Sequence, residues 1–192
     1  MTRAYNRTIY LFIVLFVLPV TVSAKEIKGI KLPSTITVAD QTLTLNGAGI
    51  RTKFVFDIYV GALYLTQKTQ SAQDIINSPH PKQVSMYFLY DEISKEKMVN
   101  GWNDGFEEVL DESALSLMRP RIETFNNAFG VTREGDVIHI RYVPDKGTEV
   151  IVNTETRATI PGTDFHQALM KIWLGPSPVD SGLKDGMLNV SE

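Results

Sequence analysis

The sequence contains no cysteine, which excludes disulfide bonds, thiolate catalysis and cysteine-ligated zinc or iron–sulfur sites. Histidine is also scarce. His80, His139 and His166 are the three in the chain, and no two of them have the spacing of metal ligands. No Ser/His/Asp order or nucleophile elbow stands out either. We therefore expect no metal site and no bound cofactor.

Long apolar runs are missing from all but the first 24 residues. That segment begins with Arg3 and Arg7, continues with the apolar run 9–17, and ends in Val22-Ser23-Ala24. This order is typical of a cleavable signal peptide. The alternative, a membrane anchor, would need about 20 apolar residues. We expect cleavage before Lys25 and a periplasmic or secreted mature protein that does not span a membrane.

The chain has slightly fewer basic than acidic side chains. The chain has 19 basic and 22 acidic side chains, and both basic residues of the first 24 leave with that segment. The mature part then has 17 basic and 22 acidic side chains, a formal net charge of −5. A net-acidic protein gives no general support for binding nucleic acid or an anionic membrane.

What remains has the length and composition of one folded domain, residues 25–192, with 43% hydrophobic residues in the whole chain. Alternating β-branched residues predict strands at 35–38, 42–45, 53–65, 84–90, 137–143, 149–153 and 156–160. Within 53–65 the alternation predicts one face on a core and one that holds polar groups. Asn46-Gly47-Ala48-Gly49 is interpreted as a flexible bend.

Helical spacing of apolar residues predicts four helices and one short helical turn at 74–77. Ser94 is expected to cap the first helix and Thr163 a later one. Pro120 lies inside the second helix, where a kink or two abutting helices are expected. The helices are expected near 94–109, 115–129, 163–173 and 180–187. Strands and helices do not alternate regularly, which favours an α+β fold with a mainly antiparallel sheet.

Several motifs of the mature chain are similar to those of one known family. The stretch LNGAGIRTKFVFDIYVGALYL (45–65) resembles the Gly-rich bend, Arg and Lys-Phe strand that open chalcone isomerase-like proteins. VIHIRYVPDKGTEVIVN (137–153) resembles their late hairpin, and the segment from Ile160 to Leu188 resembles their closing helices. The resemblance covers roughly residues 34–188 and fits an exported bacterial member. It implies an open-faced β-sandwich, a large sheet backed by a layer of helices.

The resemblance also points to Arg51 and Tyr59. Arg51 matches the Arg that holds a substrate oxygen in plant chalcone isomerases. The positions expected to hold catalytic Thr, Tyr and Asn fall on Tyr59, Ser94 and Gly101, which argues against chalcone cyclisation. Non-catalytic fatty-acid-binding members keep the Arg and pair it with a Tyr to hold a carboxylate. Arg51 and Tyr59 are the corresponding ligand-binding candidates here.

The chemistry of these two residues suits such a role, although other readings stay open. A guanidinium binds a carboxylate through two parallel hydrogen bonds, and a tyrosine hydroxyl adds another. Arg51 would alternatively pair with Asp57 or face water, and Trp102 would be a core residue or line a ligand pocket. The first hypothesis is non-catalytic binding of a fatty acid or a similar small amphipathic carboxylate. The alternatives are an isomerase or lyase that uses Arg51 on an unsaturated carbonyl compound, and an interaction module without ligand.

Overall fold

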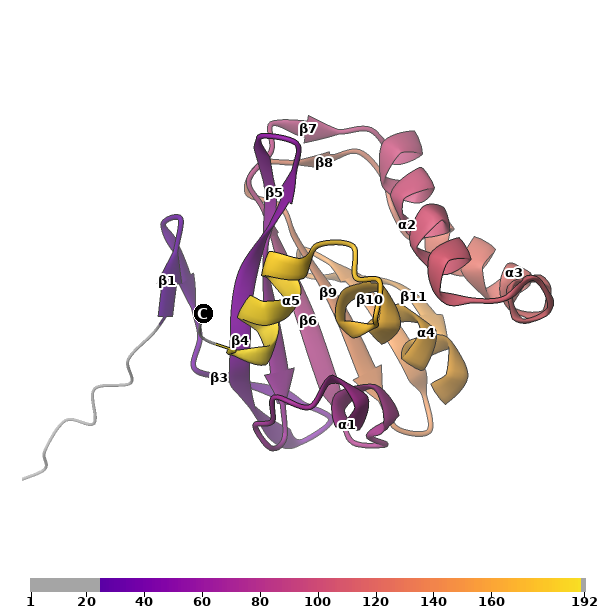
Figure 1. The fold of residues 1–192 in the computed structure, drawn as a ribbon, viewed down its shortest axis with the longest axis horizontal. Helices are drawn as coiled ribbons and strands as arrows, with labels where there is room; N and C mark the ends of the chain where they lie inside the picture. The colour runs from indigo at the N-terminus through magenta and orange to yellow at the C-terminus, as the bar shows by residue number, and fades with distance from the viewer. Residues whose placement is uncertain (1–24, 191–192) are drawn as a thin grey trace, which may run out of the picture.

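A computed structural model describes residues 25–190. The expected signal peptide, residues 1–24, lies outside the described residues. A seven-stranded antiparallel sheet of order β11-β10-β9-β6-β5-β4-β3 organises the described part (Figure 1). Its strands are β3 (Thr35–Val38), β4 (Gln41–Lys53), β5 (Phe56–Leu65), β6 (Lys82–Phe88), β9 (Val137–Val143), β10 (Gly147–Val152) and β11 (Glu155–Ile160). Two small two-stranded sheets accompany it, formed by β1 (Lys25–Ile27) with β2 (Ile30–Leu32) and by β7 (Glu92–Ile93) with β8 (Thr132–Arg133).

Five helices pack on one face of this sheet (Figure 1). They are α1 (Ala72–Asn77), α2 (Lys95–Val109), α3 (Glu112–Asn127), α4 (Thr163–Leu174) and α5 (Ser181–Leu188). The predicted α+β class, with a large antiparallel sheet backed by helices, is therefore confirmed. No helix in residues 25–190 is long and apolar enough to cross a membrane.

One predicted helix cap is right and the other is wrong, and of the two alternatives at Pro120 the division into two helices is excluded. Ser94 does cap α2, because its hydroxyl accepts a hydrogen bond from the Lys97 amide at 3.2 Å. Thr163 does not cap α4. Gly162 holds that position, and the Thr163 hydroxyl is hydrogen bonded instead to the Tyr142 hydroxyl at 2.9 Å. α3 continues through Pro120 as one helix, without a division into two.

The predicted bend at 46–49 is also wrong, since these residues lie inside β4. The glycines serve close packing: a Cβ atom on Gly47 would lie 2.6 Å from the Met187 carbonyl oxygen, and one on Gly186 would lie 2.6 Å from the Gly49 Cα. Asn46 sits at a register shift, and its side chain amide donates to the carbonyl oxygens of Thr69 and Met187. Helix α5 therefore lies directly on the backbone of β4.

The strand predicted at 53–65 begins three residues later, because the chain turns at Phe54 and Val55. Phe54 has a φ of +58°, a left-handed conformation that is unfavourable for a bulky side chain. β4 and β5 thus form a long hairpin whose tip carries apolar residues. The expectation of one polar face in this strand is likewise wrong. Tyr59 and Leu63 face the helices, whereas Val60, Ala62 and Tyr64 belong to a second core on the opposite face.

Candidate functional site

Arg51 and Tyr59, the two residues singled out from the sequence, lie next to each other. They are direct partners in the antiparallel pairing of β4 and β5, so their side chains leave the same face of the sheet. The Arg51 guanidinium carbon lies 5.8 Å from the centre of the Tyr59 ring. Hairpin register is the reason that residues eight positions apart meet here.

Asp57 does not neutralise Arg51. The Asp57 carboxylate forms an ion pair with Lys28 at 3.0 Å and accepts a hydrogen bond from the Thr52 hydroxyl. Within residues 25–190, Arg51 has no ion pair with a carboxylate. Asp180 is a second nearby acid, and its negative charge contributes to the raised pKa of Tyr59. The Asp180 carboxylate oxygens accept hydrogen bonds from the backbone amides of Thr52 and Leu183. The half-buried Arg51 guanidinium therefore has no carboxylate counter-charge among the described residues.

Tyr59 is buried and tied to the helical layer. The indole N–H of Trp173, in α4, donates a hydrogen bond to the Tyr59 hydroxyl oxygen at 3.0 Å. An indole nitrogen only donates, so the hydroxyl hydrogen of Tyr59 remains free for an acceptor of its own. Burial raises the pKa of Tyr59, while the positive charge of Arg51 partly opposes the rise. Tyr59 consequently stays protonated at neutral pH and can donate.

Both residues line a cavity of about 480 Å³ between the sheet and the helices. This volume is within the range of small-molecule binding pockets. Apart from Tyr59 on β5, the buried part of its wall is apolar and comes from β6, α2 and α4. It comprises Met86, Phe88, Met98, Trp102, Ile172 and Trp173. An apolar chamber with a guanidinium and a hydroxyl on one wall suits a molecule with a polar head and a hydrocarbon body.

Exposed lining residues mark where the cavity opens. They come from the tip of the β4–β5 hairpin, from β7 and from the first turns of α2, which lie at one end of the molecule (Figure 1). The charged ones there are Lys53, Glu92, Lys97 and Asp104. Glu92 forms an ion pair with Arg133 at 2.9 Å. The opening therefore carries charged side chains where it meets solvent. Two apolar side chains, Phe54 and Phe56, also line it.

Sequence reasoning placed some of these residues and missed others. Trp102, expected to be either a core residue or part of a ligand pocket, is buried in the core and also lines the cavity. Gly101, one of the family positions, lies on the cavity wall, whereas Ser94 is used as a helix cap. Trp173 was missed as a site residue because it is 114 positions from its hydrogen-bond partner Tyr59. No local pattern signals a contact of that kind.

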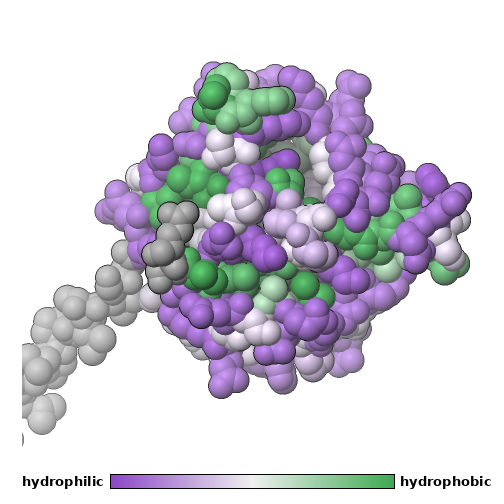
Figure 2. All heavy atoms as spheres, in the orientation of Figure 1, coloured by the Kyte–Doolittle hydropathy of each residue, from purple (hydrophilic) through white to green (hydrophobic). Residues whose placement is uncertain are grey.

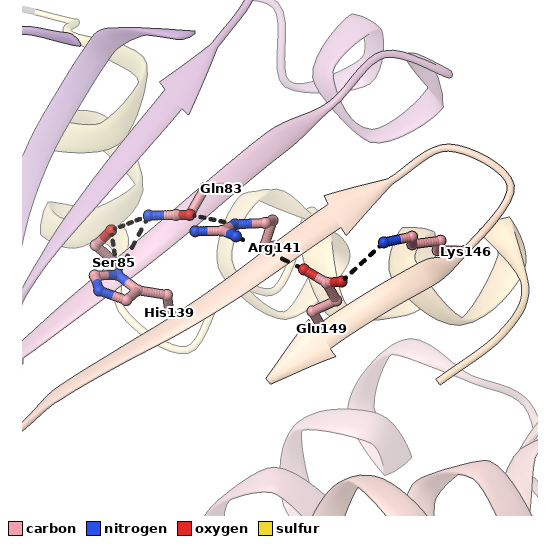
Figure 3. Close-up of polar contacts among 6 residues, drawn as sticks. All are labelled: Gln83, Ser85, His139, Arg141, Lys146 and Glu149. Atoms are coloured by element: carbon pink, nitrogen blue, oxygen red, sulfur yellow. Dashed lines mark hydrogen bonds and ion pairs between the residues drawn. The ribbon is translucent and has the colours of Figure 1, made fainter. Parts of the chain in front are cut away.

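A second polar cluster lies on the opposite face of the sheet, across β6, β9 and β10 (Figure 3). Arg141 donates from Nε to the Gln83 side-chain oxygen at 2.9 Å, so the amide nitrogen of Gln83 faces Ser85 and His139. That nitrogen donates, which makes His139 Nδ1 the acceptor and places the ring proton on Nε2. At the other end of the cluster, a Glu149 carboxylate oxygen lies 3.7 Å from Nη1 of Arg141. None of these residues lines the cavity beside Arg51.

Metal binding has no support from the arrangement of side chains. Across residues 25–190, no three His, Asp or Glu side chains are grouped so that they could share a metal ion. The cavity lining contains neither a histidine nor a close pair of carboxylates. Its chemistry is that of an anion-accepting, apolar pocket.

Comparison with known proteins adds two findings. A family model described as chalcone isomerase-like matches residues 24–189. The crystal structure of a fatty-acid binding protein from Arabidopsis thaliana is similar in fold, with a TM-score of 0.72 and 13% sequence identity. The similarity covers 87% of this chain and 95% of the plant chain. No curated protein sequence matches the chain significantly.

Proposed function

The chain belongs to the chalcone isomerase-like family, and we propose that it binds a fatty acid or a similar small amphipathic carboxylate without transforming it. The observation that carries the proposal is the position of Arg51 and Tyr59 on the wall of an apolar cavity of about 480 Å³. The carboxylate would lie against the guanidinium and the Tyr59 hydroxyl. The hydrocarbon chain would lie against Met86, Phe88 and Trp102.

The charges around Arg51 support this arrangement. Asp57 is engaged with Lys28, and Asp180 with two backbone amides, so neither carboxylate is an ion-pair partner of the guanidinium. A bound carboxylate would supply the missing counter-charge in a partly desolvated setting, where charge-assisted hydrogen bonds are strong. The Tyr59 hydroxyl hydrogen, left free by Trp173, would complete the head-group site.

The similar plant protein supports the same chemistry, since it is described as a fatty-acid binding protein of this fold. The resemblance places Tyr59, Ser94 and Gly101 where the family's catalytic Thr, Tyr and Asn are expected, which favours binding over cyclisation. Binding would need only a cavity with the Arg51 guanidinium and the Tyr59 hydroxyl on its wall, and both residues line the cavity.

Calorimetric titration of delipidated protein tests the proposal. Wild-type protein is expected to bind a long-chain fatty acid, and Arg51→Ala to weaken that binding about tenfold to a hundredfold, because hydrogen bonds to charged groups contribute about 1.5–3 kcal/mol. The matching fatty alcohol, which has no charge, should lose little affinity. Arg157→Ala is the control, since Arg157 pairs with Glu155 at the far edge of the sheet.

Two results would contradict the proposal. One is wild-type protein that binds no fatty acid, and the other is equal affinity in the Arg51→Ala and Arg157→Ala variants. Turnover of enone substrates that depends on Arg51 would instead favour the isomerase or lyase alternative, in which the guanidinium stabilises an oxyanion.

We also propose that the protein acts in the periplasm or outside the cell. The support is the segment of residues 1–24, with its two arginines, apolar run and small residues before Lys25. Mass analysis of the protein isolated from its own cells should give a chain that begins at or near Lys25. A mature chain that keeps residues 1–24 would contradict this location.

A further inference from the structure

The tip of the β4–β5 hairpin exposes three consecutive apolar side chains. Phe54 is 90% exposed, Val55 84% and Phe56 52%. Figure 2 shows a hydrophobic patch at the end of the molecule where Figure 1 places this tip. The other large apolar side chains that are exposed among the described residues stand singly: Leu117, Val131 and Val190. A cluster of this kind marks an interaction surface, whereas isolated apolar residues are ordinary.

The backbone conformation at the tip is unfavourable for the residue found there. Phe54 adopts a φ of +58°, a conformation that glycine or asparagine takes with less strain. Because the Phe54 side chain is almost fully exposed, packing against the rest of the protein does not offset the strain of this backbone conformation. Strain retained at an exposed position points to a function of the side chain itself.

The tip is continuous with the cavity. Phe54 and Phe56 line the cavity, and the Phe56 ring packs edge-on against Tyr90, with ring centres 5.5 Å apart, at the same opening. Phe54 and Phe56 at the end of the hairpin therefore line the same cavity as the buried side chains of Met86 and Phe88. A hydrocarbon chain that leaves the cavity at this point would meet the exposed phenylalanines first.

Charge and area favour a lipid surface over a second copy of the chain. Near the opening, Asp57 and Glu92 are each paired with a cation, while Lys53, Lys97 and Asp104 have no ion pair among the described residues. Lys53 lies at the base of the turn. A lysine there can extend toward lipid phosphates. The three apolar side chains expose on the order of 400 Å² together, taking ~150–250 Å² for one aromatic side chain. A stable protein interface buries about 800 Å² on each partner.

We propose that this tip, Phe54-Val55-Phe56, inserts into the surface of a lipid bilayer, so that a fatty acid passes directly between the bilayer and the cavity. The insertion depends on apolar area and not on overall charge, since the mature chain is net acidic. The inference rests on the proposed binding function, because the bilayer is the source or destination of the cavity's ligand.

Tryptophan substitutions test the contact itself. Val55→Trp places a fluorophore at the tip, and Leu117→Trp places one at an equally exposed position on α3, away from the cavity. Both native tryptophans are buried and give a constant background. With phosphatidylcholine vesicles, the Val55→Trp emission should shift to the blue and be quenched by bromine-labelled phosphatidylcholine, whereas Leu117→Trp should not respond.

Glutamate substitutions at the same two positions test the consequence. Val55 does not line the cavity, so Val55→Glu should keep its affinity for a fatty acid in vesicle-free solution. Its association with vesicles should weaken at least tenfold, and its rate of fatty-acid transfer should no longer rise with vesicle concentration. Leu117→Glu should behave as wild type in all three measurements.

The outcomes separate the two proposals. Intact fatty-acid binding with no vesicle response at position 55, or an equal response at position 117, overturns the membrane contact. Self-association that Val55→Glu abolishes, without a vesicle response, also overturns it and assigns the tip to a second copy. Failure of wild-type protein to bind a fatty acid in vesicle-free solution overturns the proposed function instead.

Discussion

Arg51 and Tyr59 are direct partners in adjacent antiparallel strands, with the guanidinium carbon 5.8 Å from the phenol ring centre. The pairing fixes their separation through backbone hydrogen bonds, so the relative position of the two residues does not depend on a loop. Trp173 then holds the Tyr59 hydroxyl from the helical side at 3.0 Å. The positions of both side chains are therefore set by the sheet and by α4.

Replacing Tyr59 by Phe should weaken fatty-acid binding about tenfold or more, because the carboxylate loses a hydrogen-bond donor. The Trp173 indole N–H loses its acceptor as well, which should lower the free energy of unfolding by about 1–3 kcal/mol. Calorimetric titration and urea denaturation measure the two effects.

Tyr64 provides a matched control for that substitution. It lies on the same strand and is equally buried, but it faces the other core, away from Trp173 and the cavity. Tyr64→Phe should leave both affinity and stability close to wild type. Equal losses in the two variants would show that Tyr59 acts only through packing.

Gly47→Ala should destabilise the protein by about 3 kcal/mol, the upper part of the usual range for overpacking. The new methyl group would collide with backbone carbonyl oxygens of α5, which cannot rotate away as a side chain can. Thermal and urea unfolding would measure the change. Gly101→Ala is the contrasting variant, since nothing lies within 4 Å of its Cβ position in α2, and it should stabilise by up to about 1 kcal/mol. Equal stability of both variants would contradict the close contact of α5 with β4.

Lys82 should make stability depend on alkaline pH. Burial lowers its pKa to about 8 in the folded protein, from a usual value near 10.5. Above pH 8 the folded chain releases this proton while the unfolded chain keeps it, so the free energy of unfolding should rise with pH. The rise attributable to Lys82 should be about 2 kcal/mol between pH 8 and 9.5.

Denaturation of wild-type protein and of Lys82→Met across this pH window measures that contribution. Methionine has similar length and no charge, so the rise should be absent from the variant. The Lys82 ammonium also donates to the Ser78 carbonyl oxygen at 2.6 Å and lies 4.9 Å from the centre of the Tyr142 ring. A rise that persists unchanged in the variant would mean that another group titrates.

His139 should keep its ring proton on Nε2 and have a pKa below the usual value. Burial is the main cause of the lowered pKa, and the charge of Arg141 adds to it. Nδ1 is already an acceptor for Gln83, so protonation there would break the row of hydrogen bonds in Figure 3. Two-dimensional NMR of the ring nitrogens during an acid titration would identify the tautomer and the pKa. A neutral ring protonated at Nδ1 would contradict the orientation assigned to Gln83.

Sequence patterns were sufficient for most elements but failed where backbone packing decided the structure. The apolar periodicity of α2 and the N-cap at Ser94 are local, and both were predicted. Gly47 and Gly49 looked like a bend because glycine usually marks one. Their actual role is to admit α5, a segment some 140 residues later. The turn at Phe54 escaped prediction because a phenylalanine stands where turn chemistry favours glycine or asparagine.

By itself the sequence determined the α+β class and the expectation of an exported chain, because composition and periodicity are local properties, and its resemblance to the family pointed to Arg51 and Tyr59. The cavity, the bond from Trp173 to Tyr59 and the location of the exposed hairpin tip at the cavity opening were decided only by the tertiary structure. These features arise where strands and helices far apart in the chain converge. Their physical origin is long-range packing, which no short stretch of residues encodes.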